Sequence, residues 1–248
     1  MNIAALIVAA GASSRMGDGK KKEYHPLLGQ HDLCVKHDRN SVLTGEGQPL
    51  TVLGTVFSVF AENPRISIIV VVHPVKAEIG EQAARGAIGE ALIKRCNKEL
   101  HFVPGGENRR LSVYHGLSLL AAFKTDYVLI HDGARPWLDQ TLVNRVIDEV
   151  IEREAVIPVI PFTETPKELD AGGHIKRHLK RANLALAQTP QAFLFDKILK
   201  AHQKAAEIVP QGNTEWTDDA EIYDEFIGEV AVVQGDSRNK KITFPEDL

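Results

Sequence analysis

Residues 4–26 combine small residues and cations in an order that suits a polyphosphate. An apolar run, Ala4–Ala10, ends at Gly11, and Arg15 and the lysines at 20–22 follow it. The run predicts a buried parallel strand that ends in a turn. Glycine and small side chains let backbone N–H groups approach a ligand closely, and cations beyond them would neutralise it. The pattern therefore predicts a phosphate-binding loop at the carboxyl edge of a sheet, with an ordinary strand and solvated lysines as the alternative.

Two familiar phosphate-binding loops do not match this segment. No G-x-G-x-x-G follows Ala10, so a dinucleotide-binding Rossmann site is not expected. No G-x-x-x-x-G-K-[ST] is present either, which excludes a Walker loop.

Asp132 and Arg135 follow a second apolar run, in the sequence IHDGARP at residues 130–136. An acidic residue at the carboxyl end of a parallel strand lies over the crevice where open α/β sheets bind ligands. The planar guanidinium of arginine suits bidentate contact with a phosphate. We therefore take both residues as candidates for binding a phosphorylated substrate, and a capped strand end with a surface ion pair is the alternative.

Two other patterns are weaker. Residues 104–117, PGGENRRLSVYHGL, predict a turn and then a helix that Asn108 caps. An ordinary helix start without a binding role is the alternative. His174 and His178 could share a zinc ion on a helix. On a strand they would be about 13 Å apart, at roughly 3.3 Å per residue, so we expect no metal there. No nucleophile-elbow motif is present.

Composition limits the class of protein. The chain has 248 residues, a net charge of −4 and 44% hydrophobic residues, which is ordinary for a soluble globular protein. The charge argues against a general nucleic-acid binder. Cys34 and Cys96 lack a metal or disulfide pattern and suit a reducing cytoplasm. We expect no signal peptide and no membrane span, because the first apolar run stops at Gly11 and none approaches about 20 residues.

Apolar β-rich runs alternate with helix-like segments, which predicts a single α/β domain over 1–248, with a mostly parallel twisted sheet flanked by helices. The expected strands are Ile3–Ala9, Ile66–Val72, His101–Val103, Tyr127–His131, Val156–Ile160, His174–Leu179, Ala185–Gln188 and Glu229–Val233. The expected helices are Leu50–Ala61, Lys76–Cys96, Asn108–Ala122, Gln140–Arg153, Leu194–Glu207 and Asp218–Phe226.

Two stretches interrupt this alternation. Residues 30–48 are polar and without periodicity, which predicts an inserted surface loop; a loop that closes over the site is the alternative. Residues 161–188 predict a projecting β-arm with a turn at 170–173. An isolated hairpin is only marginally stable in water, so we expect the arm to pack on a second copy of the chain.

The loop at residues 9–24 resembles the signature A-A-G-x-G-x-R-M-x-x-x-x-P-K-Q-Y of the 2-C-methyl-D-erythritol 4-phosphate cytidylyltransferase family, within the sugar nucleotidyltransferase superfamily. Arg15 and Lys22 match the two cations that this family uses on the triphosphate. Three positions depart from the signature, where glycine, proline and glutamine are replaced by Ser13, Lys21 and Glu23.

Other segments resemble the family's motifs in order along nearly the whole chain outside 30–48. They are G-G-x-x-R-x-x-S at 105–112, H-D-[AG]-A-R-P at 131–136, the arm threonine and lysine at 163–167, R-x-x-L at 181–184, T-P-Q-x-F at 189–193, T-D-[DE]-A at 217–220 and N-x-K-[VIL]-T-x-P-E-D-L at 239–248.

The resemblance implies a Rossmann-like nucleotidyltransferase fold and a set of site residues. It gives catalytic roles to Arg15, Lys22 and Lys241. The nucleotide-binding residues it implies are Ala9, Ala10, Gly11, Ala12, Gly105, Gly106, Glu107 and Ser112, of which the glycine turn and the serine read the cytosine. The substrate-binding residues it implies are Asp132, Arg135, Thr165, Arg181 and Thr189. Thr165 and Arg181 would reach the substrate of a second subunit in a homodimer.

The resemblance also implies an activity. CMP would pass from CTP to 2-C-methyl-D-erythritol 4-phosphate, giving 4-diphosphocytidyl-2-C-methyl-D-erythritol and pyrophosphate, in the non-mevalonate pathway to isoprenoid precursors. The expected cofactor is Mg²⁺ or another divalent cation, held mainly by the triphosphate with Asp132 as a possible ligand. Two alternatives stay open. One is a cytidylyltransferase for ribitol 5-phosphate or another sugar phosphate. The other is a catalytically impaired nucleotide-binding dimer, given Ser13, Lys21 and the insertion.

Overall fold

The computed structural model of the chain describes residues 1–11, 21–27, 50–76, 79–208 and 216–248. Ala12, Arg15 and the insertion at 30–48 lie outside these residues. Among the described residues, no helix has both the length and the apolar sequence needed to cross a bilayer.

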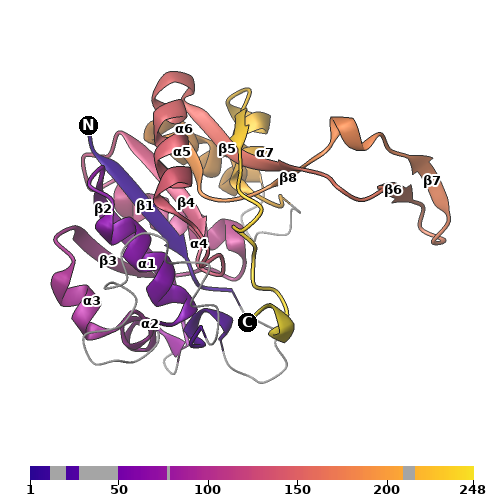
Figure 1. Ribbon diagram of the computed structural model, residues 1–248. Helices are drawn as coiled ribbons and strands as arrows, with labels where there is room; N and C mark the ends of the chain where they lie inside the picture. The colour runs from indigo at the N-terminus through magenta and orange to yellow at the C-terminus, as the bar shows by residue number, and fades with distance from the viewer. Residues whose placement is uncertain (12–20, 28–49, 77–78, 209–215) are drawn as a thin grey trace.

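A mixed, mostly parallel sheet with helices packed on both sides forms the body of the protein (Figure 1), which confirms the predicted fold class. The strands lie in the order β10-β5-β9-β4-β1-β2-β3, and β8 pairs with β5. Their bounds are β1 (Ile3–Val8), β2 (Ile66–His73), β3 (Glu99–Pro104), β4 (Tyr127–Asp132), β5 (Ala155–Pro161), β8 (Ala185–Ala187), β9 (Gln191–Leu194) and β10 (Ala231–Gln234). Because β1 to β4 pair in parallel, their carboxyl ends meet at one edge of the sheet.

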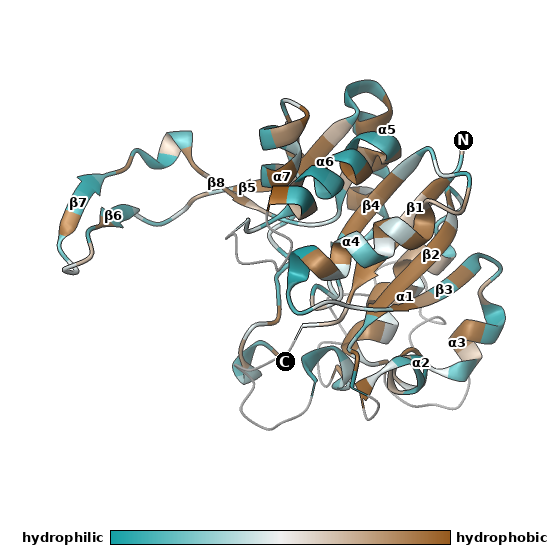
Figure 2. Ribbon diagram, turned by 180° about the vertical axis from the view of Figure 1, so that it is seen from behind, coloured by the Kyte–Doolittle hydropathy of each residue, from teal (hydrophilic) through white to brown (hydrophobic). Residues whose placement is uncertain are grey.

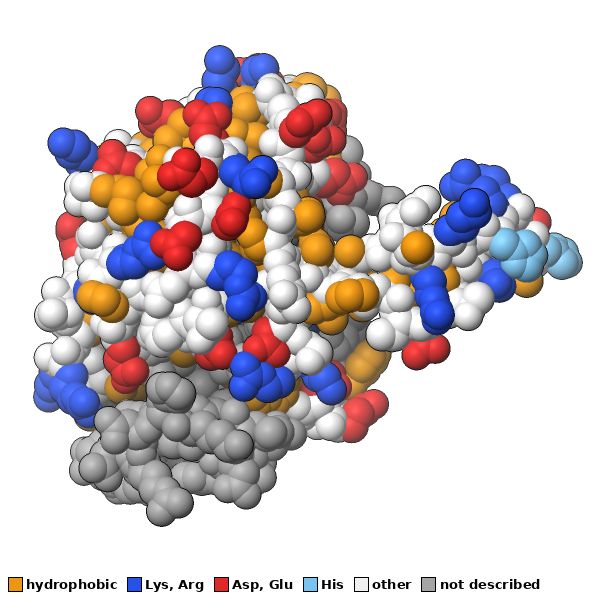
Figure 3. Space-filling view, turned by 45° about the horizontal axis from the view of Figure 1, so that its top comes forward, with side chains coloured by type: hydrophobic (Ala, Val, Ile, Leu, Met, Phe, Trp, Pro, Cys, Tyr) orange, Lys and Arg blue, Asp and Glu red, His pale blue; other side chains and the backbone are white. Residues whose placement is uncertain are grey.

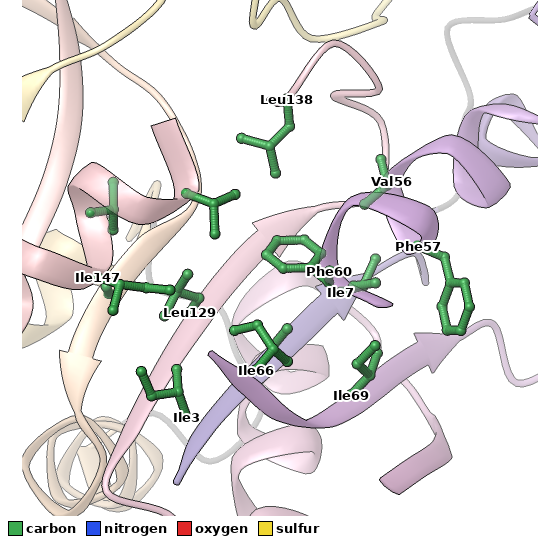
Figure 4. Packing of buried hydrophobic residues seen from close by; sticks show 14 of the residues in the cluster. Ile3, Ile7, Val56, Phe57, Phe60, Ile66, Ile69, Leu129, Leu138 and Ile147 are labelled. Carbon is green, nitrogen blue, oxygen red and sulfur yellow. The ribbon is translucent and has the colours of Figure 1, made fainter. Parts of the chain in front are cut away.

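Alternate residues of β1 point to opposite faces and meet different helices. One face packs on α1 (Val52–Glu62) and α5 (Gln140–Arg153), and the other on α4 (Arg109–Leu120), α6 (Phe195–Ile208) and α7 (Asp219–Phe226). All six residues of β1 are buried, as expected for a strand covered on both sides. Figure 2 shows the apolar strands between the helices, and Figure 4 shows Phe57 and Phe60 of α1 over this core.

The arm leaves the body between β5 and β8. Its two strands, β6 (Lys167–Leu169) and β7 (Ile175–His178), pair in antiparallel fashion and pair with no other strand among the residues that the structure describes. Leu169 and Ile175 are 58% and 53% exposed, and Figure 3 shows cationic and histidine side chains on the arm's surface. Within a single chain, this hairpin therefore buries little of its own apolar surface.

The structure divides one predicted helix and adds to the sheet a strand that was not predicted. The expected helix Lys76–Cys96 is divided into α2 (Glu81–Ile88) and α3 (Glu90–Arg95), because Gly89 between them has a φ of 93° that a helix does not allow. The strand β9 was not predicted at all, and the structure places it antiparallel between β4 and β5.

The segment after β10 returns across the carboxyl edge of the sheet. The backbone N–H of Ile242 donates to the backbone oxygen of Ala134 at 2.8 Å. This bond brings Lys241 next to the end of β4, although it lies more than one hundred residues later in the sequence.

Candidate active site

A cavity of about 690 Å³ lies at the edge where the parallel strands end. Its walls are formed by Gly11 beyond β1, the short 3-10 helix η2 (Lys22–Tyr24), the turn at 105–112, and Asp132 with Lys241. The volume falls in the range of small-molecule sites, roughly 300–1,000 Å³.

Asp132 is the centre of charge in this cavity. Lys241 Nζ donates to its Oδ2 at 2.8 Å, and Arg109 Nε donates to its Oδ1 at 3.2 Å. Arg135 Nε lies 3.7 Å from Oδ2. Burial alone would raise the pKa of this carboxyl, but Arg109, Lys241 and Arg135 outweigh burial and hold the pKa well below its usual range. Asp132 is therefore an anion that gathers three cations at the sheet edge.

Lys22 also lines the cavity, from the short helix η2. It is a buried lysine whose Nζ donates to the backbone oxygen of Ile242 at 2.9 Å. This bond places its ammonium beside the same returning segment that carries Lys241. Two lysines from distant parts of the sequence thus line one cavity.

The turn after β3 packs tightly against the end of β1. A Cβ built on Gly105 would lie 2.3 Å from Ala10 Cβ and 2.8 Å from Ser112 Oγ, so no larger residue fits. Ser112 Oγ accepts from the Gly106 N–H at 3.1 Å and donates to the Asn108 backbone oxygen at 2.8 Å. Asn108 caps α4 through the Leu111 N–H, as its place in the sequence predicts.

A model of the family described as 2-C-methyl-D-erythritol 4-phosphate cytidylyltransferase (IspD) matches residues 3–248. The chain belongs to this family. This match confirms the family that the sequence motifs indicated. It also confirms the predicted class of enzyme, a nucleotidyltransferase.

Relatives and solved structures agree with this assignment. The bifunctional enzyme IspD/IspF of Bradyrhizobium sp. (strain ORS 278) is 37% identical over 246 residues, which cover 99% of this chain and 54% of that protein. The chain thus spans about half the length of the curated relatives it matches. The 4-diphosphocytidyl-2C-methyl-D-erythritol synthase of Anaerococcus prevotii has a TM-score of 0.73 and 25% identity, covering 99% of this chain and 94% of that one. The 2-C-methyl-D-erythritol 4-phosphate cytidylyltransferase of Thermus thermophilus has a TM-score of 0.67 and 26% identity, covering 100% and 95%.

Most of the residues that the cytidylyltransferase resemblance implies lie in or beside this cavity. Those that line it are Ala10, Gly11, Lys22, Gly105, Gly106, Glu107, Ser112, Asp132 and Lys241. Ala9 is fully buried behind them, and its N–H donates to the Val72 backbone oxygen at 2.9 Å. Arg135 lies against Asp132 and donates from NH1 to the Asn239 backbone oxygen at 2.9 Å.

Thr189 lies beneath the cavity of this cytidylyltransferase-family chain and does not line it. Its hydroxyl accepts from the Asp132 N–H at 3.1 Å and lies 3.0 Å from His131 Nδ1. Burial lowers the pKa of His131 to about 4, so the ring is neutral at pH 7, with Nε2 3.2 Å from the Arg135 backbone oxygen. A neutral histidine and a threonine hydroxyl therefore fix the backbone at Asp132.

Thr165 and Arg181 are exposed on the arm, apart from the cavity of their own chain. Arg181 NH1 donates to the Thr163 backbone oxygen at 3.1 Å. His174 and His178 lie on or next to β7 rather than on a helix, and the described residues contain no cluster of three metal-ligating side chains.

Sequence reasoning missed a buried network behind Asp132. Arg109 NH2 lies 2.8 Å from Asp219 Oδ2, while its Nε donates to Asp132. Asp219 is fully buried at the start of α7, and its Oδ1 lies 3.2 Å from His202 Nε2. The T-D-[DE]-A motif at 217–220 was the available signal, but it indicates no partner for Asp219. The structure shows instead that Asp219 orients Arg109.

The donor set at the cavity fits a divalent cation held mainly by its substrate. Asp132 offers carboxylate oxygens at the cavity wall, but Lys241 and Arg109 already contact them. Mg²⁺ commonly keeps several waters and binds through one or two carboxylates together with substrate phosphates. Asp132 is therefore a possible single ligand rather than part of a protein-built metal cage.

Proposed function

We propose that this chain transfers CMP from CTP to 2-C-methyl-D-erythritol 4-phosphate and releases pyrophosphate. Family membership supports this activity, and the observation that carries it is the cluster of cations at the sheet edge. Lys241, Arg109 and Arg135 meet around one buried carboxylate, and Lys22 lines the same cavity, which is of nucleotide size. The triphosphate would be a second anion in this cavity. It would take over some of the contacts that the cations make with Asp132.

The chemistry follows from the charges. A phosphate oxygen of the polyol phosphate attacks the α-phosphorus of CTP in line, and the bond to the β-phosphate oxygen breaks. Because two anions must meet, positioning and charge neutralisation contribute most of the rate enhancement. Lys22 and Lys241 neutralise the transition state and the leaving pyrophosphate. The attacking phosphate is already ionised, so no general base is needed.

Other residues position the nucleotide and the substrate. Gly105 and Gly106 allow the cytosine to approach the backbone closely, and Ser112 holds their turn. Arg135 offers its guanidinium to the sugar phosphate. Asp132 would be the residue that holds Mg²⁺ beside the triphosphate, and the ion would reduce the negative charge on the phosphate oxygens.

The arm supplies the remaining contacts from a second copy. Its exposed Leu169 and Ile175 need a covering surface, and a homodimer with two-fold symmetry would provide one. Thr165 and Arg181 would then lie beside the partner's cavity and hold its substrate phosphate. With a net charge of −4 the chain has no basic surplus for nucleic acid, and we place its reaction in the cytoplasm.

One assay tests the reaction. Pyrophosphate release should require a divalent cation and CTP, with 2-C-methyl-D-erythritol 4-phosphate as acceptor, and ATP and GTP should react poorly. Faster turnover with ribitol 5-phosphate would reassign the acceptor. Binding of CTP without turnover on either polyol phosphate would indicate a nucleotide-binding dimer that lacks activity.

A mixing experiment tests the shared site. Arg181→Ala and Lys22→Ala chains should each be slow, and mixed dimers of the two should recover activity, because one of their two sites has both residues intact. A monomer in solution, or verified mixed dimers without recovery, would refute the shared site while leaving the proposed chemistry untouched.

A further inference from the structure

Lys21 and Glu23 flank Lys22 and form an ion pair that is closed off from solvent. Lys21 Nζ lies 3.1 Å from Glu23 Oε2, and the two side chains are only 2% and 4% exposed. The same ammonium donates to the backbone oxygen of Gly11 at 2.5 Å. Lysines are almost never fully buried unless they are paired, so this arrangement holds Lys21 in one place.

The pair connects two walls of the cavity. Gly11 lies just beyond β1, at the carboxyl edge of the sheet, whereas Lys21 precedes η2. η2 is a single 3-10 turn, in which the Tyr24 N–H donates to the Lys21 oxygen at 2.9 Å and the His25 N–H to the Lys22 oxygen at 3.3 Å. A turn this short is held mainly by contacts outside itself. Lys21 supplies such a contact to the sheet.

Lys22 is the residue that this contact would place. It is covalently next to Lys21, it lines the cavity, and its Nζ donates to the Ile242 backbone oxygen. We propose that Lys21, through its ion pair with Glu23 and its hydrogen bond to Gly11, is a positioning residue for the Lys22 ammonium. The proposal rests on the proposed function, in which Lys22 neutralises charge in the transition state.

The backbone angles at Lys21 are compatible with the proline that the family signature has at this position. The Lys21 φ of −80° and ψ of 121° are angles that proline also adopts. The signature has proline at this position and glutamine at the position of Glu23. The buried contacts of the Lys21 side chain with Glu23 and Gly11, which we call the tie, therefore replace the restraint of a proline ring. Like that ring, the tie limits the directions in which Lys22 can point.

Three variants separate positioning from stability. Lys21→Met removes the tie and leaves Glu23 without the ammonium of Lys21. Lys21→Met with Glu23→Gln removes both charges, so thermal stability should return, but the tie is still missing. Lys21→Pro with Glu23→Gln restores a backbone restraint in place of the tie. Lys240→Met is the matched control, because Lys240 is an exposed lysine in the returning segment.

The expected results differ between turnover and binding. Both Lys21→Met variants should lose about tenfold to a hundredfold in kcat, as small misplacements of a catalytic group do, while KM for CTP changes little. The Lys21→Pro, Glu23→Gln variant should regain most of the lost kcat, and Lys240→Met should match the parent chain. Near-parental kcat in the folded Lys21→Met, Glu23→Gln variant would overturn the proposal. So would losses that only follow the unfolded fraction.

A readout without substrate keeps this proposal separate from the proposed function. Hydrogen exchange of the Tyr24 and His25 amides should speed up in both Lys21→Met variants and slow again in the proline variant. If the parent chain releases no pyrophosphate but exchange follows this order, the proposed function fails and the tie stands. Unchanged exchange in all the variants would reject the tie, whatever the activity of the parent.

Discussion

The ion pairs around the cavity and those on the arm use similar side chains in opposite surroundings. The Asp132 side chain is only 10% exposed and contacts Lys241, which is 37% exposed, at 2.8 Å. On the arm, Glu168 contacts Lys176 and Arg177 at 2.7 Å each, but these two cations are 64% and 69% exposed. The distances are alike, so the difference lies in the solvent. Water screens the arm pairs more strongly, whereas the carboxylate of the cavity pairs is buried.

This difference decides what each group of charges can do. Desolvated charges interact strongly. Removing one partner lowers the stability of the protein considerably, because the other charge stays buried without it. Such charges are fixed before a ligand arrives, which is what electrostatic catalysis needs. Exposed charges on the arm exchange their contacts with water, so within one chain they are replaceable. The effect of a substitution on activity and stability should therefore decrease with its distance from the cavity.

The largest effect should come from Lys22 and Lys241, which both line the cavity. Lys22→Ala and Lys241→Ala should each lower kcat by about 10²–10³-fold, by analogy with the loss of a donor that acts in the transition state. CTP binding, measured by titration calorimetry, should weaken far less than turnover. Lys240→Ala, which removes the exposed neighbour, should behave like the parent. Near-full kcat in both cavity variants would contradict their catalytic role.

The next effect should come from the network behind Asp132. Asp219→Asn removes a buried negative charge from Arg109 and should lower the free energy of unfolding by about 3 kcal/mol, with a fall in kcat/KM as Arg109 shifts. Denaturant unfolding and steady-state kinetics measure the two effects. Asp224→Asn, an exposed position on the same helix, is the control. Equal stability of the two variants would show that Arg109 does not depend on Asp219.

A smaller effect should appear as pH dependence. The pKa of His131 is about 4 in the folded chain and about 6.5 when unfolded, so the unfolded chain binds more protons between these values. The stability contribution of His131 is therefore complete above pH 6.5 and is lost as pH falls, by about 2 kcal/mol between pH 7 and 5. The His131→Asn variant should show a flatter stability curve over this window. Identical slopes in the parent chain and the His131→Asn variant would rule the effect out.

The smallest effect should come from the arm. Glu168→Gln removes the carboxylate from two exposed cations and should leave the melting temperature unchanged at moderate salt, because water already screens these pairs. A clear fall in melting temperature would mean that a second copy covers Glu168 in solution. The arm pairs would then be shielded from solvent, as the Asp132 carboxylate is in the cavity.

The sequence predicted best what depends on local pattern. The continuous apolar runs before Gly11 and Asp132 are β1 and β4, and their ends form the cavity as the crevice rule requires. β9 was not predicted because it is four residues long and lacks a clear alternating pattern. The break at Gly89 was missed because the apolar spacing continues across it.

Side-chain partners far apart in the chain were beyond a pattern-based reading. Arg109 and Asp219 lie on different helices, and nothing local in either segment indicates the other. Lys21 and Glu23 looked like two separate departures from a signature, yet they contact each other. The direction in which the Thr189 hydroxyl points, toward the Asp132 N–H, depends on the antiparallel pairing of β9 with β4.

The return of the chain across the sheet edge has a consequence for protein synthesis. Asp132, Arg109 and Arg135 leave the ribosome about one hundred residues before Lys241 does. A nascent chain can therefore form the parallel strands β1 to β4, the glycine turn and the carboxylate while Lys241 is still inside the exit tunnel. Translation that stalls before residue 241 would leave a chain without the Lys241 ammonium and without the Ile242 oxygen that Lys22 contacts, so under the proposed function incomplete chains would be unable to start the reaction.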